Sequence, residues 1–225
     1  MRLIAFGTAR LNSTRCKNKM LRPYADTSLA ELAVKRLASL TSFDDVFFAA
    51  HENELLDLSR DYLPAASIIE RSRESALENT SITVIYDYLR DIDFDYCMWI
   101  NSCHAFLKPS TIESAATRFR QGKSRSMTAV RKRYSWFYTL EGRSINNIPT
   151  AAATEQSVPL LEVTHAFHIY QKDHFFKTAS YWNNTENDPE LFQIDDVEAL
   201  DVDTETDFLI SESIYKATLS EKNNE

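Results

Sequence analysis

The sequence predicts an α/β protein with a mainly parallel β-sheet that is covered by helices. Short apolar segments typical of buried strands alternate with segments whose apolar residues recur at helical spacing. Such alternation gives parallel strands with helices packed on both faces of the sheet. The length, 225 residues, suffices for one sizeable domain with a well-buried core. We therefore expect a single domain over residues 1–225, with ligands bound at the carboxyl ends of its strands.

The expected strands are short, rich in apolar residues and bounded by polar or turn residues. In chain order they are residues 2–6, 44–50, 66–71, 96–101, 126–132, 164–170 and 199–203. The expected helices are residues 28–40, 52–62, 81–92, 109–119, 172–182 and 205–219. Ser28 with Glu31 forms a capping box at the start of the first helix, and Thr204 with Asp207 caps the last one.

The polar stretch at about 134–162 interrupts this alternation and contains the aromatic run RYSWFY. One interpretation is an excursion that packs on another subunit. The other is a long surface loop, and the residues alone leave both open.

Composition excludes several classes of protein. The chain has only three glycines, which argues against a glycine-rich phosphate loop, and a formal net charge of −8, which argues against general nucleic-acid binding. Three cysteines without a CxxC pair suggest neither a disulfide framework nor a zinc site, and reduced thiols fit the cytosol. No apolar run has the length of a membrane span. We expect a cytoplasmic protein without nucleic-acid or membrane partners.

A strongly basic loop, ARLNSTRCKNKMLRP, follows the first expected strand at residues 9–23. It has no acidic residue, although the whole chain is acidic. Cations at this edge, with Ser13, Thr14 and backbone amides, could hold a polyphosphate. The alternative is a solvated basic turn. The basic residues of the loop are Arg10, Arg15, Lys17, Lys19 and Arg22.

This loop resembles the opening motif of the sugar-acid cytidylyltransferases, of the acylneuraminate and ketodeoxyoctonate types. In that motif an Ala-Arg pair precedes a serine by three residues and a lysine by nine, as Arg10, Ser13 and Lys19 do here. The resemblance implies a three-layer, Rossmann-like nucleotidyltransferase fold whose basic loop wraps the phosphates of CTP. It thereby implies nucleotide-binding roles for Arg10, Ser13, Arg15 and Lys19.

The acidic run ALDVDTETDF near the C-terminus resembles the end of the same catalytic domain. On the expected strand 199–203, Asp201 and Asp203 share one face, where two hard oxygen ligands suit Mg²⁺. Asp203 is the stronger metal candidate, because its position matches both family types. Thr204 and Asp207 are better explained by helix capping.

The middle of the chain resembles the family less closely. Asn79 and Thr80 stand where an Asp-Thr pair commonly contacts the cytosine nucleotide. Asn101 replaces a glutamine after the central strand, so it is expected to bind nucleotide and acceptor.

The largest departures from the family concern the acceptor. His104 replaces a habitual residue after the central strand, His165 replaces a glycine beside the sugar site, and Tyr138 stands where a lysine is customary. We expect these three residues, with Asn101, to bind the acceptor. Cys103 falls where the ketodeoxyoctonate type has a metal-binding aspartate, and we do not expect it to act as a nucleophile.

The resemblance as a whole implies transfer of CMP from CTP to a sugar acid, with Mg²⁺ as cofactor. Arg10, Lys19 and Asp203 would be the catalytic residues. A homodimer, formed partly by residues 134–162, is also expected. Two alternatives remain open: a metal-dependent glycosyltransferase of similar fold, because Asp201-Val-Asp203 has the form Asp-x-Asp, and a nucleotide-binding homologue without activity.

Overall fold

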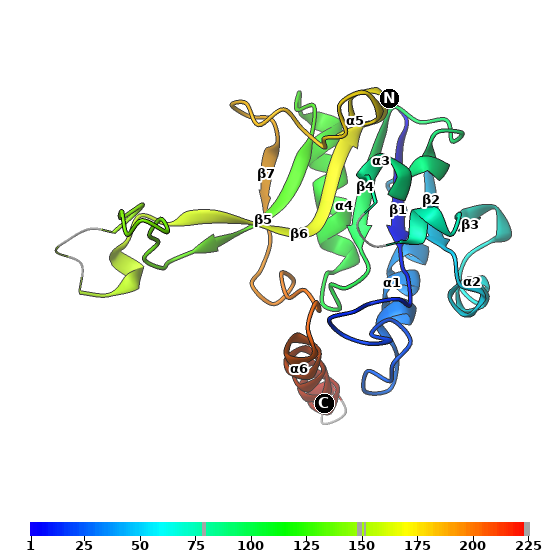
Figure 1. Cartoon of the computed structure of the whole chain (residues 1–225), viewed down its shortest axis with the longest axis horizontal. Helices are drawn as coiled ribbons and strands as arrows, with labels where there is room; N and C mark the ends of the chain where they lie inside the picture. The colour runs from blue at the N-terminus through cyan, green and yellow to red at the C-terminus, as the bar shows by residue number, and fades with distance from the viewer. Residues whose placement is uncertain (78–79, 148–149, 151, 223–225) are drawn as a thin grey trace.

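The computed structural model describes residues 1–77, 80–147, 150 and 152–222, and within them it shows one seven-stranded sheet (Figure 1). The order of the strands is β3-β2-β1-β4-β6-β5-β7. Their bounds are β1 Leu3–Thr8, β2 Asp45–Ala50, β3 Ile68–Glu70, β4 Tyr96–Asn101, β5 Met127–Arg133, β6 Leu160–Gln171 and β7 Glu190–Gln193.

Most pairs of neighbouring strands are parallel. β1 pairs in parallel with β2 and β4, β2 with β3, and β5 with β7, whereas β6 runs antiparallel to both β4 and β5. The first five residues of β1, Leu3 to Gly7, are all buried, as a strand covered on both faces requires. The predicted α/β fold with a mainly parallel sheet is confirmed.

Side-chain caps satisfy amide groups at the start of α1 and α6. The Ser28 side chain accepts a hydrogen bond from the Glu31 amide at 3.1 Å. Thr204 Oγ1 accepts from the Asp207 amide at 3.2 Å, while the Asp207 carboxylate accepts from the Thr204 amide at 2.7 Å, a reciprocal capping box. The helices are α1 Leu29–Ala38, α2 Asn53–Arg60, α3 Ile82–Ile85, α4 Pro109–Gln121, α5 Lys172–Thr178 and α6 Glu205–Lys222.

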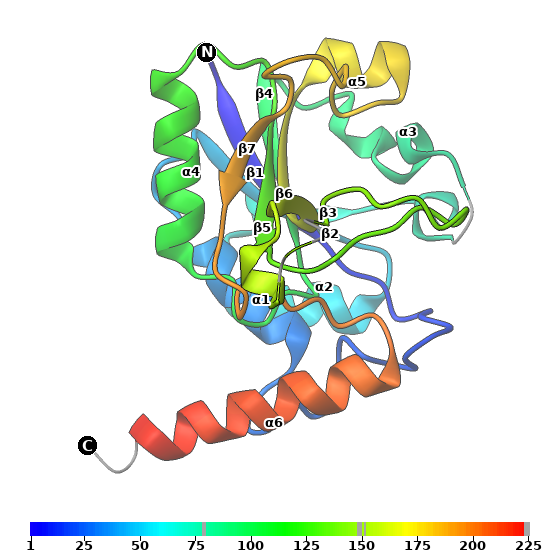
Figure 2. The same ribbon diagram turned by 90° about the vertical axis from the view of Figure 1, so that its left-hand side faces the viewer.

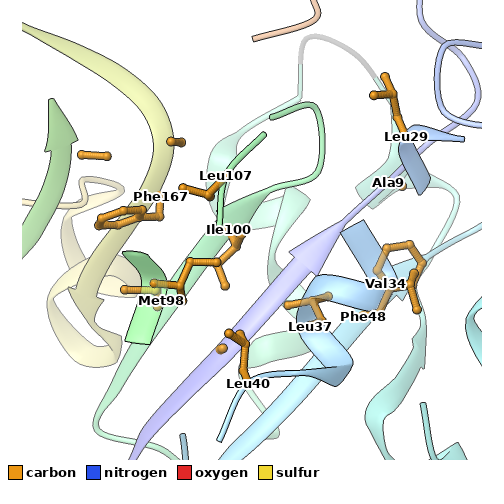
Figure 3. Packing of buried hydrophobic residues seen from close by; sticks show 14 of the residues in the cluster. Ala9, Leu29, Val34, Leu37, Leu40, Phe48, Met98, Ile100, Leu107 and Phe167 are labelled. Carbon is orange, nitrogen blue, oxygen red and sulfur yellow. The ribbon is translucent and has the colours of Figure 1, made fainter. Parts of the chain in front are cut away.

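Helices cover both faces of the sheet, with α1 and α4 on one face and α3 and α5 on the other (Figure 2). The larger apolar cluster lies under α1 and α4, and Figure 3 shows Val34 and Leu37 of α1 beside Phe48 of β2. The smaller cluster lies under α3 and α5 and includes Phe6 and Phe175. Among the described helices, none is both long and apolar enough to cross a membrane.

Two expected elements differ from the structure. Residues 199–203 form no strand; they cross the loop after β4, where the Val202 amide donates to the Cys103 carbonyl at 3.2 Å. The last strand is instead β7, a four-residue segment too short for its alternation to be recognised. The helix expected at 81–92 is only α3, followed by a 3-10 turn at Asp87–Leu89, because the β-branched residues of ITVI are weak helix formers.

β5 and β6 continue into an arm, described at residues 134–147, 150 and 152–159, that projects away from the sheet (Figure 1). Asn146 ties its two sides together, since its Nδ2 donates to the Ser135 carbonyl at 2.8 Å and to the Val158 carbonyl at 2.6 Å. The arm leaves many apolar side chains in contact with solvent. The exposed large apolar residues of the arm are Tyr134, Trp136, Tyr138, Leu140, Ile145 and Val158.

Candidate active site

The basic loop after β1 and the acidic segment before α6 lie together at the carboxyl edge of the sheet, as Figures 1 and 2 show. Lys19 Nζ donates to the Val202 carbonyl at 2.6 Å, although 183 residues separate the two. The same ammonium lies 3.3 Å from Asp203 Oδ1, and the Arg15 guanidinium lies 3.0 Å from Asp203 Oδ2. The two ends that carry the family motif thus form one charged cluster.

Tyr24 anchors the basic loop to α6. Its ring is fully buried and packs edge-on against Phe208, with centroids 5.4 Å apart, and against Tyr215 at 5.2 Å. Its hydroxyl lies 2.6 Å from Ser211 Oγ, which satisfies the polar end of the ring. Apolar packing therefore brings the loop and the helix together.

A cavity of about 260 Å³ opens at this edge. Four of its lining residues are cationic, whereas Asp203 is its acidic residue. On a chain of net charge −8, such a concentration of positive charge suits an anion that carries several charges. The cationic residues are Arg10, Arg15, Lys19 and Arg71, and the polar ones that join them are Thr8, Ser13, Ser75 and Asn101.

Lys19 is an enclosed cation of the basic loop, with 12% of its side chain exposed. Burial by itself would lower the pKa of its ammonium, but Cys103, Asp203 and Asp201 outweigh that effect and raise the pKa above its usual value. Lys19 is therefore charged at neutral pH. It stands at the junction of the loop and the acidic segment, where a phosphate would meet it.

Asp201 and Asp203 have different surroundings. Asp203 faces Arg15 and Lys19, and 40% of its side chain is exposed. Asp201 is more enclosed, and burial followed by repulsion from Asp203 raises the pKa of its carboxyl to about 6. The strand that was expected to align the two carboxylates is absent, and a loop presents them instead.

These carboxylates fit the expected divalent cation as a partial ligand set. In the described part of the chain, no three His, Cys, Asp or Glu side chains converge into a complete metal site. Asp201 Oδ1 is nevertheless buried without a hydrogen-bond partner, so one carboxylate oxygen is available as a ligand. Mg²⁺ usually takes one or two carboxylates and completes its shell with water and substrate phosphates.

Arg71 is a cavity residue that the loop motif does not include. It is 4% exposed, its Nη2 donates to the Ala9 carbonyl at 3.0 Å, and its Nε is buried without a partner among the described residues. Burial lowers the pKa of its guanidinium. Its position at the end of the expected strand 66–71 could have identified it, because ligands bind at such strand ends. The apolar cavity residues Leu77, Ile85 and Trp99 were also missed.

Other expected site residues lie off the cavity wall. Thr80 is half-buried just before α3, and Asn79 lies outside the described residues. Tyr138 is 53% exposed on the arm, where its hydroxyl accepts from Asn147 Nδ2 at 2.9 Å. His104 is fully buried, so in this structure it offers an acceptor no surface.

His165 lies in the irregular part of β6, where the pairing with β5 shifts register. Its φ of 54° is in the left-handed region that glycine favours, at the position where the sugar-acid families commonly have glycine. Its Nδ1 lies 3.0 Å from His168 Nε2, and His168 Nδ1 lies 2.8 Å from Thr128 Oγ1. His168 also stacks on Trp99 of the cavity wall, with ring centroids 5.4 Å apart. The exposed imidazole of His165 is thus held beside the cavity.

Asn101 and Cys103 follow β4 directly. Asn101 lines the cavity, and its Oδ1 accepts from the Cys103 amide at 3.0 Å. Burial raises the pKa of the Cys103 thiol to about 11, so it is protonated at neutral pH. This protonation supports the expectation that Cys103 is not a nucleophile.

One comparison with known proteins identifies a family. The family model described as Cytidylyltransferase matches residues 7–212. A search of curated proteins found no match.

Several solved structures share the fold at low sequence identity. One is the CMP:2-keto-3-deoxy-manno-octonic acid synthetase complexed with CTP, with 10% identity and a TM-score of 0.69 over 97% of this chain and 100% of that one. Another is the 4-diphosphocytidyl-2C-methyl-D-erythritol synthase from Anaerococcus prevotii, with 10% identity and a TM-score of 0.64 over 96% of each chain. A cytidylyltransferase from Leptospira borgpetersenii is 14% identical, with a TM-score of 0.59 over 98% of this chain and 96% of that one.

Proposed function

The chain belongs to the cytidylyltransferase family, and from that premise we propose that it transfers CMP from CTP to a hydroxyl group of a sugar acid. The acceptor oxygen attacks the α-phosphorus of CTP, the bond between the α-phosphorus and the bridging oxygen breaks, and pyrophosphate leaves. The acceptor proton passes to solvent. The observation that carries this proposal is the cavity with four cations at the carboxyl edge of the sheet.

The basic loop would bind the triphosphate. Arg10, Arg15 and Lys19 supply charge, and Ser13 supplies a hydroxyl, all on the cavity wall. Positioning and charge neutralisation account for most of the catalysis in phosphoryl-transfer reactions, so a cluster of cations suffices for much of it. Lys19 is the main candidate for the charge that develops in the transition state.

The apolar side of the cavity would receive the cytosine base. Leu77, Ile85 and Trp99 offer a non-polar surface there, and Arg71 adds a buried guanidinium beside it. An apolar surface with one directional donor is typical of pockets that bind a flat polar ring. The expected roles of Asn79 and Thr80 in nucleotide binding remain proposals.

The acceptor would enter beside β4 and β6. Asn101 lines the cavity there, and the exposed imidazole of His165 contacts His168, which stacks on Trp99 of the cavity wall. A carboxylate is a suitable partner for an imidazole N–H group, which supports a sugar acid as the acceptor.

Asp201 and Asp203 would hold Mg²⁺ together with phosphate oxygens. When bound, the cation neutralises phosphate charge and polarises the α-phosphate. Asp203 forms ion pairs with both Arg15 and Lys19. These two cations would contact the phosphates instead when CTP binds.

The arm supports a homodimer as a further proposal. Its apolar residues, among them Trp136 and Leu140, are 42% and 104% exposed in the single chain. Exposed apolar groups of this kind often mark a surface between proteins. Tyr138, which lies on the arm, would then belong to the dimer contact.

Pyrophosphate release tests the proposal directly. The purified protein is incubated with CTP, Mg²⁺ and a panel of nonulosonic and octulosonic acids, with ATP, GTP and UTP as matched controls. Release that requires CTP and one acid supports the proposal. CTP binding without release for any acid favours the non-catalytic homologue, which the changed residues around Cys103 and His104 make the second candidate.

A further inference from the structure

Two acceptor atoms face each other beneath the cavity, on His104 and Asp201. His104 Nδ1 lies 3.8 Å from Asp201 Oδ1, and both atoms are buried. Neither has a hydrogen-bond partner among the described residues. A separation of 3.8 Å is too long for a hydrogen bond, so the pair is unsatisfied.

The tautomer of His104 follows from its other ring nitrogen. Nε2 lies 3.1 Å from the Thr164 carbonyl, which can only accept, so Nε2 carries the proton and Nδ1 has a lone pair. A neutral imidazole whose far N–H group donates to a carbonyl is the usual form of a metal-binding histidine.

Both residues are held in place before any ligand arrives. The Arg36 guanidinium, fully buried in α1, donates to the His104 carbonyl. Asn101 Nδ2 lies 3.5 Å from Asp201 Oδ2. The loop after β4 and the segment before α6 are also joined by the backbone hydrogen bond between Val202 and Cys103. The two facing atoms are therefore a preorganised pair.

We propose that His104 Nδ1 and Asp201 Oδ1 together bind one divalent transition-metal cation. Metal bonds to histidine nitrogen and carboxylate oxygen are about 2.0–2.2 Å long, so one ion can reach both atoms across the gap. Imidazole nitrogen favours first-row transition metals, whereas Mg²⁺ prefers an all-oxygen shell. The pair therefore favours Mn²⁺ over Mg²⁺, and Mn²⁺ would take the place of the Mg²⁺ assigned above to Asp201 and Asp203. Phosphate oxygens of CTP would complete the shell, and only that last step rests on the proposed function.

Electron paramagnetic resonance tests the metal site without any turnover. The metal-free protein is titrated with Mn²⁺ alone, and pulsed spectra are searched for the nitrogen-14 modulation that a coordinated imidazole produces. We expect the parent protein to show this modulation. We also expect Mg²⁺ to displace Mn²⁺ only in large excess.

Variants then identify the ligands. His104→Gln should lose the nitrogen modulation and bind Mn²⁺ at least about tenfold more weakly. Asp201→Asn should weaken binding to a similar extent while both variants keep the circular dichroism of the parent. His174→Gln, on α5 outside the site, is the matched control and should behave as the parent.

The spectrum of the parent protein shows whether a histidine coordinates Mn²⁺ even if His104→Gln fails to fold. Bound Mn²⁺ without nitrogen modulation overturns the proposal, as does parent-like Mn²⁺ affinity in His104→Gln. Either result would favour a different explanation for the two buried atoms, namely a proton shared by Asp201 and His104. Failure of the proposed function would be seen separately, as metal binding with a nitrogen signal but no release of pyrophosphate.

Discussion

The two halves of the sheet differ in regularity and in what they carry. β3, β2, β1 and β4 are parallel, and residues 8–103 supply the whole cavity wall except Asp203. The half formed by β6, β5 and β7 contains the antiparallel strand, the register shift and the projecting arm. The regular half presents cations for a nucleotide, whereas the irregular half carries His165 and the arm. This division explains why the nucleotide motif is recognisable in the sequence while the acceptor is not.

We expect the largest loss of turnover in the regular half of the sheet, for Lys19→Ala. Loss of a charge that stabilises a developing phosphate charge raises the barrier by about 2–4 kcal/mol, or roughly 30- to 1000-fold in turnover. Pyrophosphate release with saturating CTP measures it, and circular dichroism checks the fold. Lys17→Ala, an exposed neighbour in the same loop, is the control. A near-parent rate for Lys19→Ala would mean that the loop is only a solvated turn.

Asp203→Asn should lower the rate of metal-dependent turnover by about 10- to 100-fold, because it removes a proposed metal ligand. CTP binding without a divalent cation should stay the same or become tighter, since a carboxylate that repels phosphate has gone. Calorimetric titration of CTP with and without Mg²⁺ separates the two effects. An unchanged dependence of turnover on Mg²⁺ would place the metal elsewhere.

Asp201→Asn should stabilise the metal-free protein at neutral pH. Burial raises the folded-state pKa of Asp201 to about 6 from the usual 3.8, so ionisation costs stability. This cost is absent below about pH 3.8 and complete above about pH 6, with an upper bound of about 3 kcal/mol. Because Asp201 is 29% exposed, we expect about 1–2 kcal/mol.

Urea unfolding of parent and Asp201→Asn at pH 7.5 and pH 4.5, with a chelator present, measures this gain. The difference between the two proteins should shrink at the lower pH. A difference that does not depend on pH would show that the buried charge is not its source.

In the irregular half, His165→Gly should raise the KM for the acceptor by about three- to tenfold, the value of one lost hydrogen bond. The KM for CTP should not change. Because glycine adopts a φ of 54° without strain, the variant should be at least as stable as the parent. Equal changes in both KM values would argue against a role for His165 on the acceptor side.

Substitutions in the arm should change the turnover rate least. Trp136→Asp and Leu140→Asp should convert a homodimer into monomers with the same circular dichroism, because a charge is costly in an apolar contact. Light scattering measures the mass. Leu209→Asp on α6, which is 51% exposed outside the arm, is the control and should remain dimeric. A monomeric parent would defeat the dimer proposal.

Sequence reasoning anticipated the cations of the basic loop that line the cavity better than the other residues of its wall. Arg10, Ser13, Arg15 and Lys19 were predicted from their place after a strand and from their spacing, and all four line the cavity. Arg71 was missed because a lone arginine at the end of a strand has no motif around it.

The alternation of apolar and acidic residues over 199–203 predicts a strand that the structure does not contain. Alternation reports which side chains share a face if a strand forms, but it does not show that a neighbouring strand is there to pair with.

By itself, then, the sequence determined the α/β class, the capping residues of α1 and α6 and the basic loop, since these depend on local spacing and composition. Only the tertiary structure decided which distant groups meet. The contact of Lys19 with Val202, the burial of His104 and the left-handed backbone of His165 depend on how remote segments pack. No local pattern encodes such contacts, because their free energy comes from surfaces and hydrogen bonds that exist only after the chain has folded.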